Sequence, residues 1–403
     1  MDRFSLARDK AEEALSKGRE RSFARARQNA ARVRKAFQAA GVAEYDFAPS
    51  VGYGYGDRGR ESLAAVFAAA FGCEAALVRP QIASGTHAIA LALWGVLQPG
   101  GELLVATGEP YDTMRSVLGL RPTPRSFREW GIEVRVLSMA EGLDPRTLKA
   151  QFRPGTQAVL FQRSRGYARR PALRPEQLDP ALAACREAGI VSVVDNCYGE
   201  FVDVREPAAD LLVGSLTKNP GGGLAPGGGY VAGRRELVDA VADRVTAPGL
   251  GADVGAFPDG KRSLFQGLYL APQAVAEALA SADYAAAFGQ ALGWHVDPQP
   301  GAARGDIVQL IGFGDRDRLL RFAQALQAAS PVDSRARPEP EELPGYPDPV
   351  LMAGGTFISG ASLELSIDAP MRPPWDGYLQ GGISAAYAAD ALGEAFRAAC
   401  DEA

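Results

Sequence analysis

Short apolar runs alternate with helix-like runs from about residue 61 to about residue 234, and this order constrains the fold more than any other feature. Each apolar run has the length of a strand rather than of a buried helix. The helical runs between them are long enough to cross over a sheet and return in parallel. The predicted strands are 75–78, 103–106, 134–137, 159–161, 190–194 and 210–215. The alternation predicts an α/β fold whose mostly parallel sheet is covered by helices on both faces.

The second half of the chain has a different pattern. An alanine-rich helical run at 272–292 is followed by strand-like runs at 307–311 and 362–367 and by helical runs at 317–329 and from 384 onwards. A segment rich in proline and glutamate at 338–349 is predicted as a loop. We therefore predict a large α/β domain at 51–271 and, at 272–403, a linking helix with a small C-terminal α+β domain.

The first forty residues contain eleven Lys and Arg and five Asp and Glu, with few large apolar residues. This composition is typical of a basic, solvent-exposed helix. We predict an N-terminal helical arm at 1–50. A basic helix could touch an anionic partner, but a surface or subunit-contact helix is the simpler interpretation.

Composition and charge exclude several classes of protein. Hydrophobic residues make up 47% and charged residues 23% of the 403, as in globular proteins. The net charge of −5 provides no basic field for nucleic acid or an anionic membrane. Apolar runs stay well below the roughly 18 residues of a membrane helix, and the charged N-terminus is unlike a signal peptide. The four cysteines are scattered along the chain, and two histidines are too few for a multi-histidine metal site. We expect a cytoplasmic protein without nucleic-acid or membrane partners.

Two glycine motifs resemble nucleotide-binding signatures, but in the wrong context. The segment 54–59 spells G-x-G-x-x-G before a predicted helix, as in a dinucleotide-binding turn. The segment before it is polar and contains Pro49, whereas that fingerprint follows a buried strand. The segment 255–261 fits G-x-x-x-x-G-K, but Arg262 stands where a magnesium-binding Ser or Thr is required. A nucleotide-dependent oxidoreductase is therefore only the rival interpretation.

Lysine and aspartate follow two of the predicted strands. Lys218, one of only six lysines, comes after strand 210–215, and Asp195 ends the apolar run 191–195. Open α/β sheets bind ligands at this carboxyl edge. Pyridoxal phosphate requires an amine for a Schiff base and a carboxylate for its pyridine nitrogen. Either residue alone could be a surface or turn residue, but the pair, with the hydroxyls of Ser215 and Thr217, predicts pyridoxal 5'-phosphate as cofactor.

A helix start and an aromatic residue complete this predicted site. Ser84, Gly85 and Thr86 open the helical run 88–97, where free N–H groups and hydroxyls can hold a phosphate. An ordinary helix cap would look the same. Tyr111 follows the predicted strand 103–106, so its ring reaches the same edge and can stack on a cofactor or pack in a loop.

The chain resembles the fold-type-I pyridoxal-phosphate enzymes of cysteine and methionine metabolism. Within them it is most similar to the methionine gamma-lyase-like group, also labelled aluminium resistance protein or cystathionine beta-lyase. The matches extend from about residue 45 to about residue 385. They comprise the segments 52–60, 78–88, 162–167, 194–200, 214–223, 269–272 and 354–362. The resemblance implies the fold of a PLP-dependent transferase, with a large α/β domain and a smaller C-terminal one.

The resemblance also implies roles for single residues. Lys218 would form the Schiff base, Asp195 would pair with the pyridinium nitrogen, and Tyr111 would stack on the ring or protonate a leaving sulfur. The phosphate would be held by Gly85, Thr86, Ser215 and Thr217, with Tyr55 and Arg58 supplied by a neighbouring subunit. A homodimer is then the minimum active unit and a homotetramer the expected assembly.

The substrate side of the site follows the family less closely. The usual enzymes carry an Asn-Pro pair where this chain has the segment 163–166. Arg372 is the candidate clamp for an amino acid carboxylate, because guanidinium and carboxylate match as a bidentate pair. Arg165 and Tyr53 are further candidates for substrate binding. Arg372 could equally be a surface arginine.

These features together predict a PLP-dependent carbon–sulfur lyase. Its substrate would be a sulfur-containing amino acid of the cystathionine, cysteine or methionine type, cleaved after removal of the α-proton. The alternatives within pyridoxal chemistry are a transferase or a lyase for another amino acid. A protein that binds the cofactor without turnover is the non-enzymatic alternative.

Overall fold

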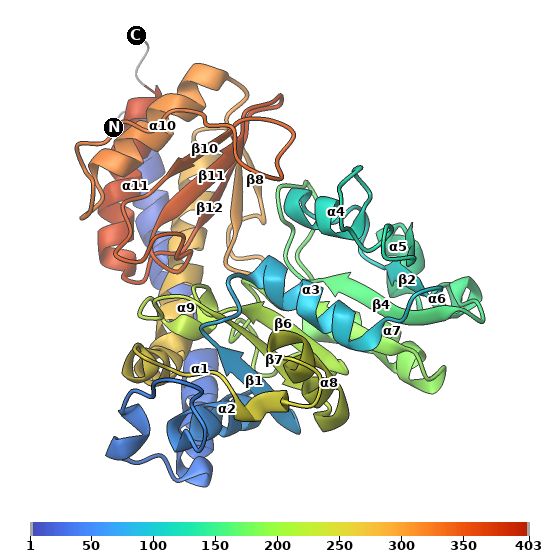
Figure 1. Ribbon diagram of the computed structural model, residues 1–403. Coiled ribbons are helices and arrows are strands. Elements are labelled where there is room, and N and C mark those ends of the chain that lie inside the picture. The colour runs from blue at the N-terminus through green and yellow to red at the C-terminus, as the bar shows by residue number, and fades with distance from the viewer. Residues whose placement is uncertain (1–2, 401–403) are drawn as a thin grey trace.

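The computed structural model describes residues 3–400, and its centre is a seven-stranded sheet (Figure 1). The strands lie in the order β1-β7-β6-β5-β4-β2-β3. Strands β2 to β6 are parallel, whereas β7 runs antiparallel between β1 and β6. The strands are β1 (Ala75–Arg79), β2 (Glu102–Val105), β3 (Glu133–Val136), β4 (Thr156–Gln162), β5 (Val191–Asp195), β6 (Leu211–Ser215) and β7 (Gly229–Gly233). The predicted mostly parallel sheet is confirmed.

Helices cover both faces of this sheet, because neighbouring strand residues point to opposite sides. Val194 belongs to a core shared with α1 (Arg3–Ala40), α2, α7 and α9 (Lys261–Ala291), whereas Val193 belongs to a core shared with α3, α4 and α8. The large-sheet helices are α2 (Arg58–Phe71), α3 (Gly85–Val96), α4 (Asp112–Leu118), α5 (Met139–Leu143), α6 (Pro145–Gln151), α7 (Pro175–Glu187) and α8 (Arg235–Val245). Burial on both faces explains why these strands read as continuous apolar runs.

A second, antiparallel sheet lies above the large one in Figure 1. Helices α10 (Arg316–Ala328) and α11 (Ala385–Cys400) contribute to its core. The predicted strand at 362–367 begins only at Ser366, because Glu364 accepts hydrogen bonds from the backbone of a loop and does not pair in the sheet. The strand order is β10 (Val350–Ala353), β11 (Ser366–Pro370), β12 (Asp376–Gln380), β9 (Gln309–Gly312) and β8 (His295–Asp297).

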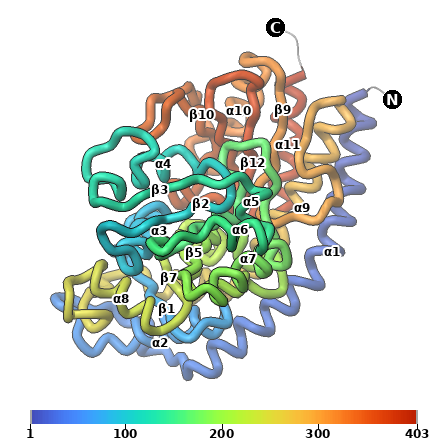
Figure 2. The backbone as a smooth tube through the Cα atoms, turned by 90° about the vertical axis from the view of Figure 1, so that its right-hand side faces the viewer, coloured from blue at the N-terminus to red at the C-terminus, as the bar shows by residue number. Residues whose placement is uncertain are grey.

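Helix α1 (Arg3–Ala40) is not a wholly solvated arm. It runs along one side of the molecule beside α9 (Lys261–Ala291), past both sheets (Figure 2). A stripe of mostly small residues on α1 is buried: Ala7, Ala11, Leu15, Gly18, Ser22, Ala26, Asn29, Val33 and Ala36. Because alanine and glycine carry little apolar surface, this buried face is hard to recognise by composition.

The predicted domain division is kept here as a proposal. Helix α9 continues through residue 271, so that boundary lies inside a helix.

The glycine segment 54–59 leads into α2, whose first turn is capped by Asp57, and a short helical turn at Glu44–Phe47 precedes it. Within residues 3–400, no helix is long and apolar enough to cross a membrane.

Candidate active site

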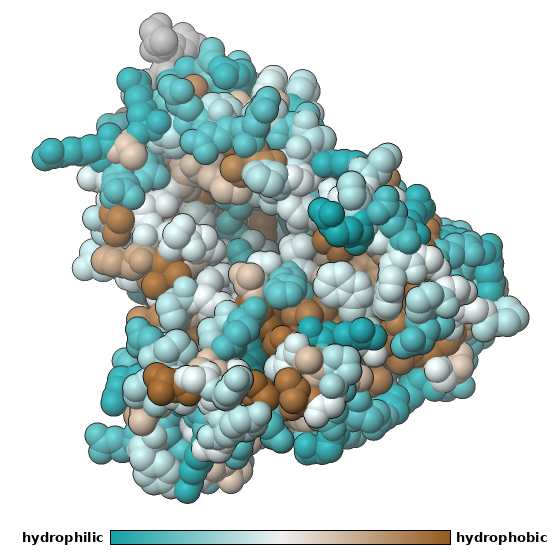
Figure 3. Space-filling view, in the orientation of Figure 1, coloured by the Kyte–Doolittle hydropathy of each residue, from teal (hydrophilic) through white to brown (hydrophobic). Residues whose placement is uncertain are grey.

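The candidate site lies at the carboxyl ends of β4, β5 and β6. Gln162 and Asp195 stand side by side in the register of β4 and β5, and Asp195 is level with Val213 on β6. A cavity of about 400 Å³ opens here, lined from the large sheet, the starts of α3 and α4, and loops of the second sheet. Figure 3 shows the surface hollowed between the two parts of the molecule. The ends of parallel strands thus form the floor of one pocket.

Lys218 lines this cavity three residues after the end of β6. Its Nζ lies 4.6 Å from the centre of the Tyr198 ring. Burial opposes the charge on this amine, but Tyr198 and Asp368 outweigh that effect and raise the pKa of Lys218 above its usual value. The amine is therefore protonated at neutral pH in this state, and its charge is directed into the pocket.

Asp195 lines the same cavity as this lysine and is buried. Its Oδ1 accepts a hydrogen bond of 3.2 Å from the backbone N–H of Cys197. Burial raises the pKa of Asp195 to about 6, although the Cys197 contacts and the charges of Arg170 and Lys218 act in the opposite direction. A positive group placed beside this carboxylate would therefore relieve an unfavourable burial.

A cradle for an anion lies beside them. Ser84 caps α3 by accepting a hydrogen bond from the His87 N–H, and Gly85 and Thr86, whose N–H groups have no partner within the helix, line the cavity. The hydroxyls of Ser215 and Thr217 lie 2.9 Å apart on the facing side. A Cβ on Gly85 would come within 3.0 Å of Cys197 Sγ, so only glycine keeps this approach open. N–H groups, hydroxyls and the missing side chain fit the phosphate of pyridoxal phosphate.

Tyr111 precedes α4 and faces the same cavity. Its N–H donates to Gln162 Oε1 at 3.1 Å, and its hydroxyl lies 3.0 Å from Thr86 Oγ1. Burial and the nearby Asp195 raise the pKa of Tyr111 well above its usual value. Its hydroxyl is therefore protonated and can donate a proton into the pocket.

Several lining residues escaped the sequence prediction. Cys197 and Tyr198 come two and three residues after Asp195, so their proximity to the carboxyl edge of the sheet could have been inferred from the strand end. Tyr346 and Asp368 reach the pocket region from the second sheet and its loops, and no local signal indicates this. Tyr167 comes from the loop after β4 and donates its hydroxyl to Asp368.

Three predicted residues of the glycine loop and the start of α2 lie outside the cavity lining of this chain. Tyr53 and Tyr55 are exposed on the glycine loop, and Arg58 pairs with Asp46 at 3.2 Å. They line neither this cavity nor a second hollow of about 410 Å³ that adjoins it.

The two candidate arginines for substrate binding are both engaged elsewhere. Arg165 is buried and paired with Asp297 at 2.7 Å, and Arg372 is paired with Asp348 at 2.6 Å. Neither lines the cavity or the adjoining hollow. The structure thus brings together the cofactor-binding candidates of the strand and helix ends, but not these arginines.

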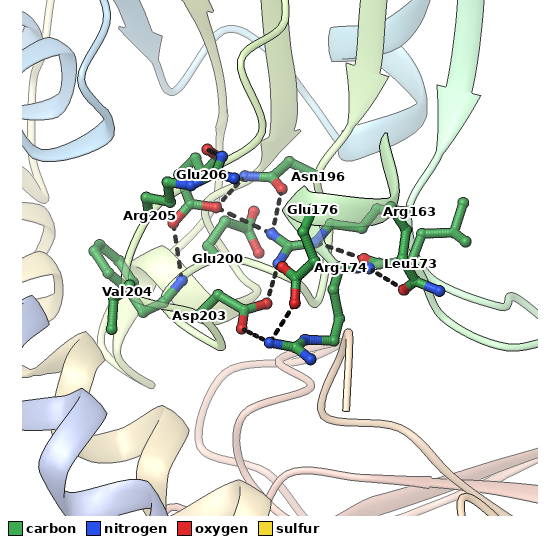
Figure 4. A network of polar contacts seen from close by, with 12 residues as sticks. Arg163, Leu173, Arg174, Glu176, Asn196, Glu200, Asp203, Val204, Arg205 and Glu206 are labelled. Carbon is green, nitrogen blue, oxygen red and sulfur yellow. Dashed lines mark hydrogen bonds and ion pairs between the residues drawn. The ribbon is translucent and has the colours of Figure 1, made fainter. Parts of the chain in front are cut away.

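A buried polar network supports the pocket from below (Figure 4). Arg163 donates hydrogen bonds to Asn196 Oδ1 at 2.8 Å and to Glu206 Oε2 at 3.0 Å, and Asn196 in turn donates to Glu206. Because Asn196 is next to Asp195, these bonds fix the turn that follows β5. The segment 163–166 that departs from the usual family pattern therefore begins with a structural arginine.

Comparisons with known proteins agree with this geometry. A protein from Listeria innocua, described as a "putative cystathionine beta-lyase involved in aluminum resistance", is 42% identical with a TM-score of 0.94, over 98% of this chain and 99% of that one. The uncharacterized protein YnbB of Bacillus subtilis is 42% identical over 90% of this chain and 88% of its own. The pyridoxal-5'-phosphate-dependent protein YhfS of Escherichia coli, 18% identical, covers 98% of this chain and 96% of its own at a TM-score of 0.58 and shares the fold.

The family model for methionine gamma-lyase matches residues 5–400, nearly the whole chain. The fold is that of the fold-type-I pyridoxal-phosphate enzymes, and the family implies this cofactor. The lysine, the aspartate and the anion cradle lie at one sheet edge, so the sequence motifs, the fold and the site all indicate the same family. This chain belongs to the methionine gamma-lyase family.

Proposed function

We propose that this protein is a PLP-dependent carbon–sulfur lyase that removes the α-proton of a sulfur-containing amino acid and expels its sulfur group. The observation that carries the proposal is the Lys218 amine in a cavity that also holds the Asp195 carboxylate and an anion cradle. Pyridoxal phosphate, when bound, supplies the ring that draws electrons from the substrate's α-carbon. The family and its carbon–sulfur lyase neighbours support the reaction class.

The residues of the pocket divide this work between them. The hydroxyls and N–H groups around Gly85, Ser215 and Thr217 would hold the phosphate, and Asp195 would keep the ring nitrogen protonated. The Lys218 amine would hold the cofactor and, once free and neutral, accept the α-proton. The Tyr111 hydroxyl lines the same cavity and carries a proton, so it would be the group that donates to the leaving sulfur.

Borohydride trapping tests the assignment of Lys218. The purified protein should be yellow and lose its visible band on reduction, and the covalent adduct should map to the peptide that contains Lys218. The Lys149→Arg variant, altered at an exposed lysine on α6, should form the same adduct. An adduct on any other lysine would contradict the assignment.

Product analysis tests the reaction class separately. Incubation with cystathionine, cysteine and methionine should release a thiol, ammonia and a 2-oxo acid from at least one of them. A trapped adduct without any thiol release from the panel would leave the cofactor assignment standing and reject the lyase.

A second copy of the chain completes the proposal. Tyr55 and Arg58 lie on an exposed loop and helix start outside the cavity of their own chain. We assign them to the phosphate site of a neighbouring subunit, so that a homodimer is the minimum active unit and a tetramer the expected assembly. The roles of Arg165, Arg372 and Tyr53 in substrate binding stay predictions.

A further inference from the structure

A carboxylate from the second sheet lies near the candidate catalytic lysine. Asp368 on β11 lines a hollow of about 410 Å³ that adjoins the active-site cavity. The two spaces share Lys218, Tyr198 and Tyr167 in their linings. A substrate held at Lys218 would therefore have Asp368 within the space that adjoins it.

Two hydrogen bonds fix this carboxylate. The Tyr167 hydroxyl donates to Asp368 Oδ2 at 3.1 Å, and Gln380 Nε2 donates to the same oxygen at 2.9 Å. Within residues 3–400, the other oxygen, Oδ1, accepts no hydrogen bond and pairs with no cation within 4 Å. The side chain is thus held in place with one acceptor free to face the hollow. A fixed acceptor costs a ligand little reorganisation.

The charges around the two spaces are unbalanced. Of the described residues that line them, Lys218 is the only Lys or Arg, whereas four are acidic: Asp112, Asp195, Asp333 and Asp368. Two arginines of this region are paired elsewhere, Arg372 with Asp348 and Arg169 with Asp376. In the proposed reaction the Lys218 amine must be neutral to accept the α-proton, so it then offers Asp368 no ammonium group. Asp368 is half-buried, and a carboxylate in such a place whose one neighbouring cation becomes neutral favours a positively charged ligand.

We propose that Asp368 is a specificity-determining residue that selects amino acids whose side chain ends in an ammonium group. This inference rests on the function proposed above, because it needs the substrate's α-carbon to sit at Lys218. A charge-assisted hydrogen bond to a fixed carboxylate is stronger than one between neutral groups, and a neutral side chain would leave Asp368 unpaired. We expect at least about a tenfold preference for the cationic side chain.

Two thioethers of the same length test this preference. S-(2-aminoethyl)-L-cysteine ends in an ammonium group, and S-propyl-L-cysteine ends in a methyl group at the same position. The holoenzyme is titrated with each compound, and the change in the cofactor's absorption gives the apparent dissociation constant. Cleavage with water would release cysteamine or propanethiol together with pyruvate and ammonia, and gives kcat/KM as a second readout.

Two variants separate a direct contact from a general acidic field. Asp368→Asn keeps an oxygen that can accept from Tyr167 and Gln380 but removes the charge, so the preference should fall to less than about threefold. Glu339→Gln removes one charge from an exposed loop position lining the neighbouring surface hollow and should retain the preference. The cofactor's absorption band, unchanged in both variants, serves as the control for an intact site.

Each outcome is decisive for one of the two proposals. If both compounds change the spectrum without a preference, or if Asp368→Asn keeps the preference, the inference about Asp368 is wrong while the proposed function stands. A preference for the propyl compound would show that another group, such as a cation from a second copy, neutralises Asp368. If neither compound nor any other amino acid changes the spectrum, the proposed function fails and this inference fails with it.

Discussion

Glu200 is a buried carboxyl in the network beneath the site (Figure 4). Its Oε1 accepts a hydrogen bond of 2.8 Å from the Tyr230 hydroxyl, whereas its Oε2 has no partner. Burial raises the pKa of Glu200 well above its usual value, and the nearby Glu206 adds to this effect while Tyr230 and Arg163 oppose it. The proton on Glu200 is therefore bound more tightly in the folded chain than in the unfolded chain.

This shift predicts a pH dependence with a definite sign. A carboxyl whose pKa is higher in the folded state favours folding below its ordinary pKa and loses that contribution as the pH rises toward the folded value. Glu200→Gln removes this pH-dependent contribution. The unfolding free energy of the variant, relative to that of the natural chain, should therefore rise by up to about 1 kcal/mol per pH unit between about pH 5 and about pH 7. Urea unfolding of both proteins across this range measures the gain. A difference that does not change with pH would contradict the prediction.

At the scale of elements, α1 and α9 lie close because small residues line their contact. A Cβ on Gly18 of α1 would lie 3.1 Å from Asp283 Oδ2 and 3.3 Å from Ala280 Cα, both on α9. A larger side chain there must push the two helices apart. Since α1 contributes to the cores of both sheets, this contact matters for the whole chain.

We expect Gly18→Val to lower the unfolding free energy by about 1–3 kcal/mol, the usual cost of overpacking a tight contact. Gln28→Val places the same residue on the exposed face of α1 and gives the effect of valine without this contact; helix propensity alone would make Gly18→Val the more stable of the two variants. Urea unfolding of both variants gives the comparison. Equal stability of the two would show that the helices separate without cost.

The strands and their carboxyl edge could be predicted from the sequence because both are local features. A continuous apolar run marks each buried strand, and the residues after it, such as Asp195 and Lys218, must lie at the edge. Asp368 could not be predicted, because its place depends on how the second sheet packs over the first. Arg372 shows the same limit, since its pairing with Asp348 is a tertiary contact. Strand β7 could not be predicted from the sequence, because its short apolar run is bounded by glycine.

At the scale of the whole molecule, both parts of the chain build the cavity, but Tyr55 and Arg58, which are predicted to bind the phosphate, do not line it in their own chain. Tyr55 is 67% exposed, and the Arg58 guanidinium stacks 4.3 Å from the centre of the Tyr45 ring. Exposed aromatic and arginine side chains of this kind are typical of interfaces between proteins. An isologous dimer would bring this loop from each copy to the cavity of the other.

Mixing two inactive variants tests this arrangement. Lys218→Ala lacks the amine of its own site, and Arg58→Gln lacks the residue that it would lend to its partner. In a mixed dimer, one of the two sites combines an intact Lys218 with an intact Arg58 from the other copy. Random exchange of subunits should therefore restore about a quarter of the natural activity. A mixture of Lys218→Ala with Lys218→Arg has no intact site and should stay inactive. If Arg58 served its own chain, no mixed dimer would hold an intact site, and exchange confirmed by mass spectrometry without recovery would establish that.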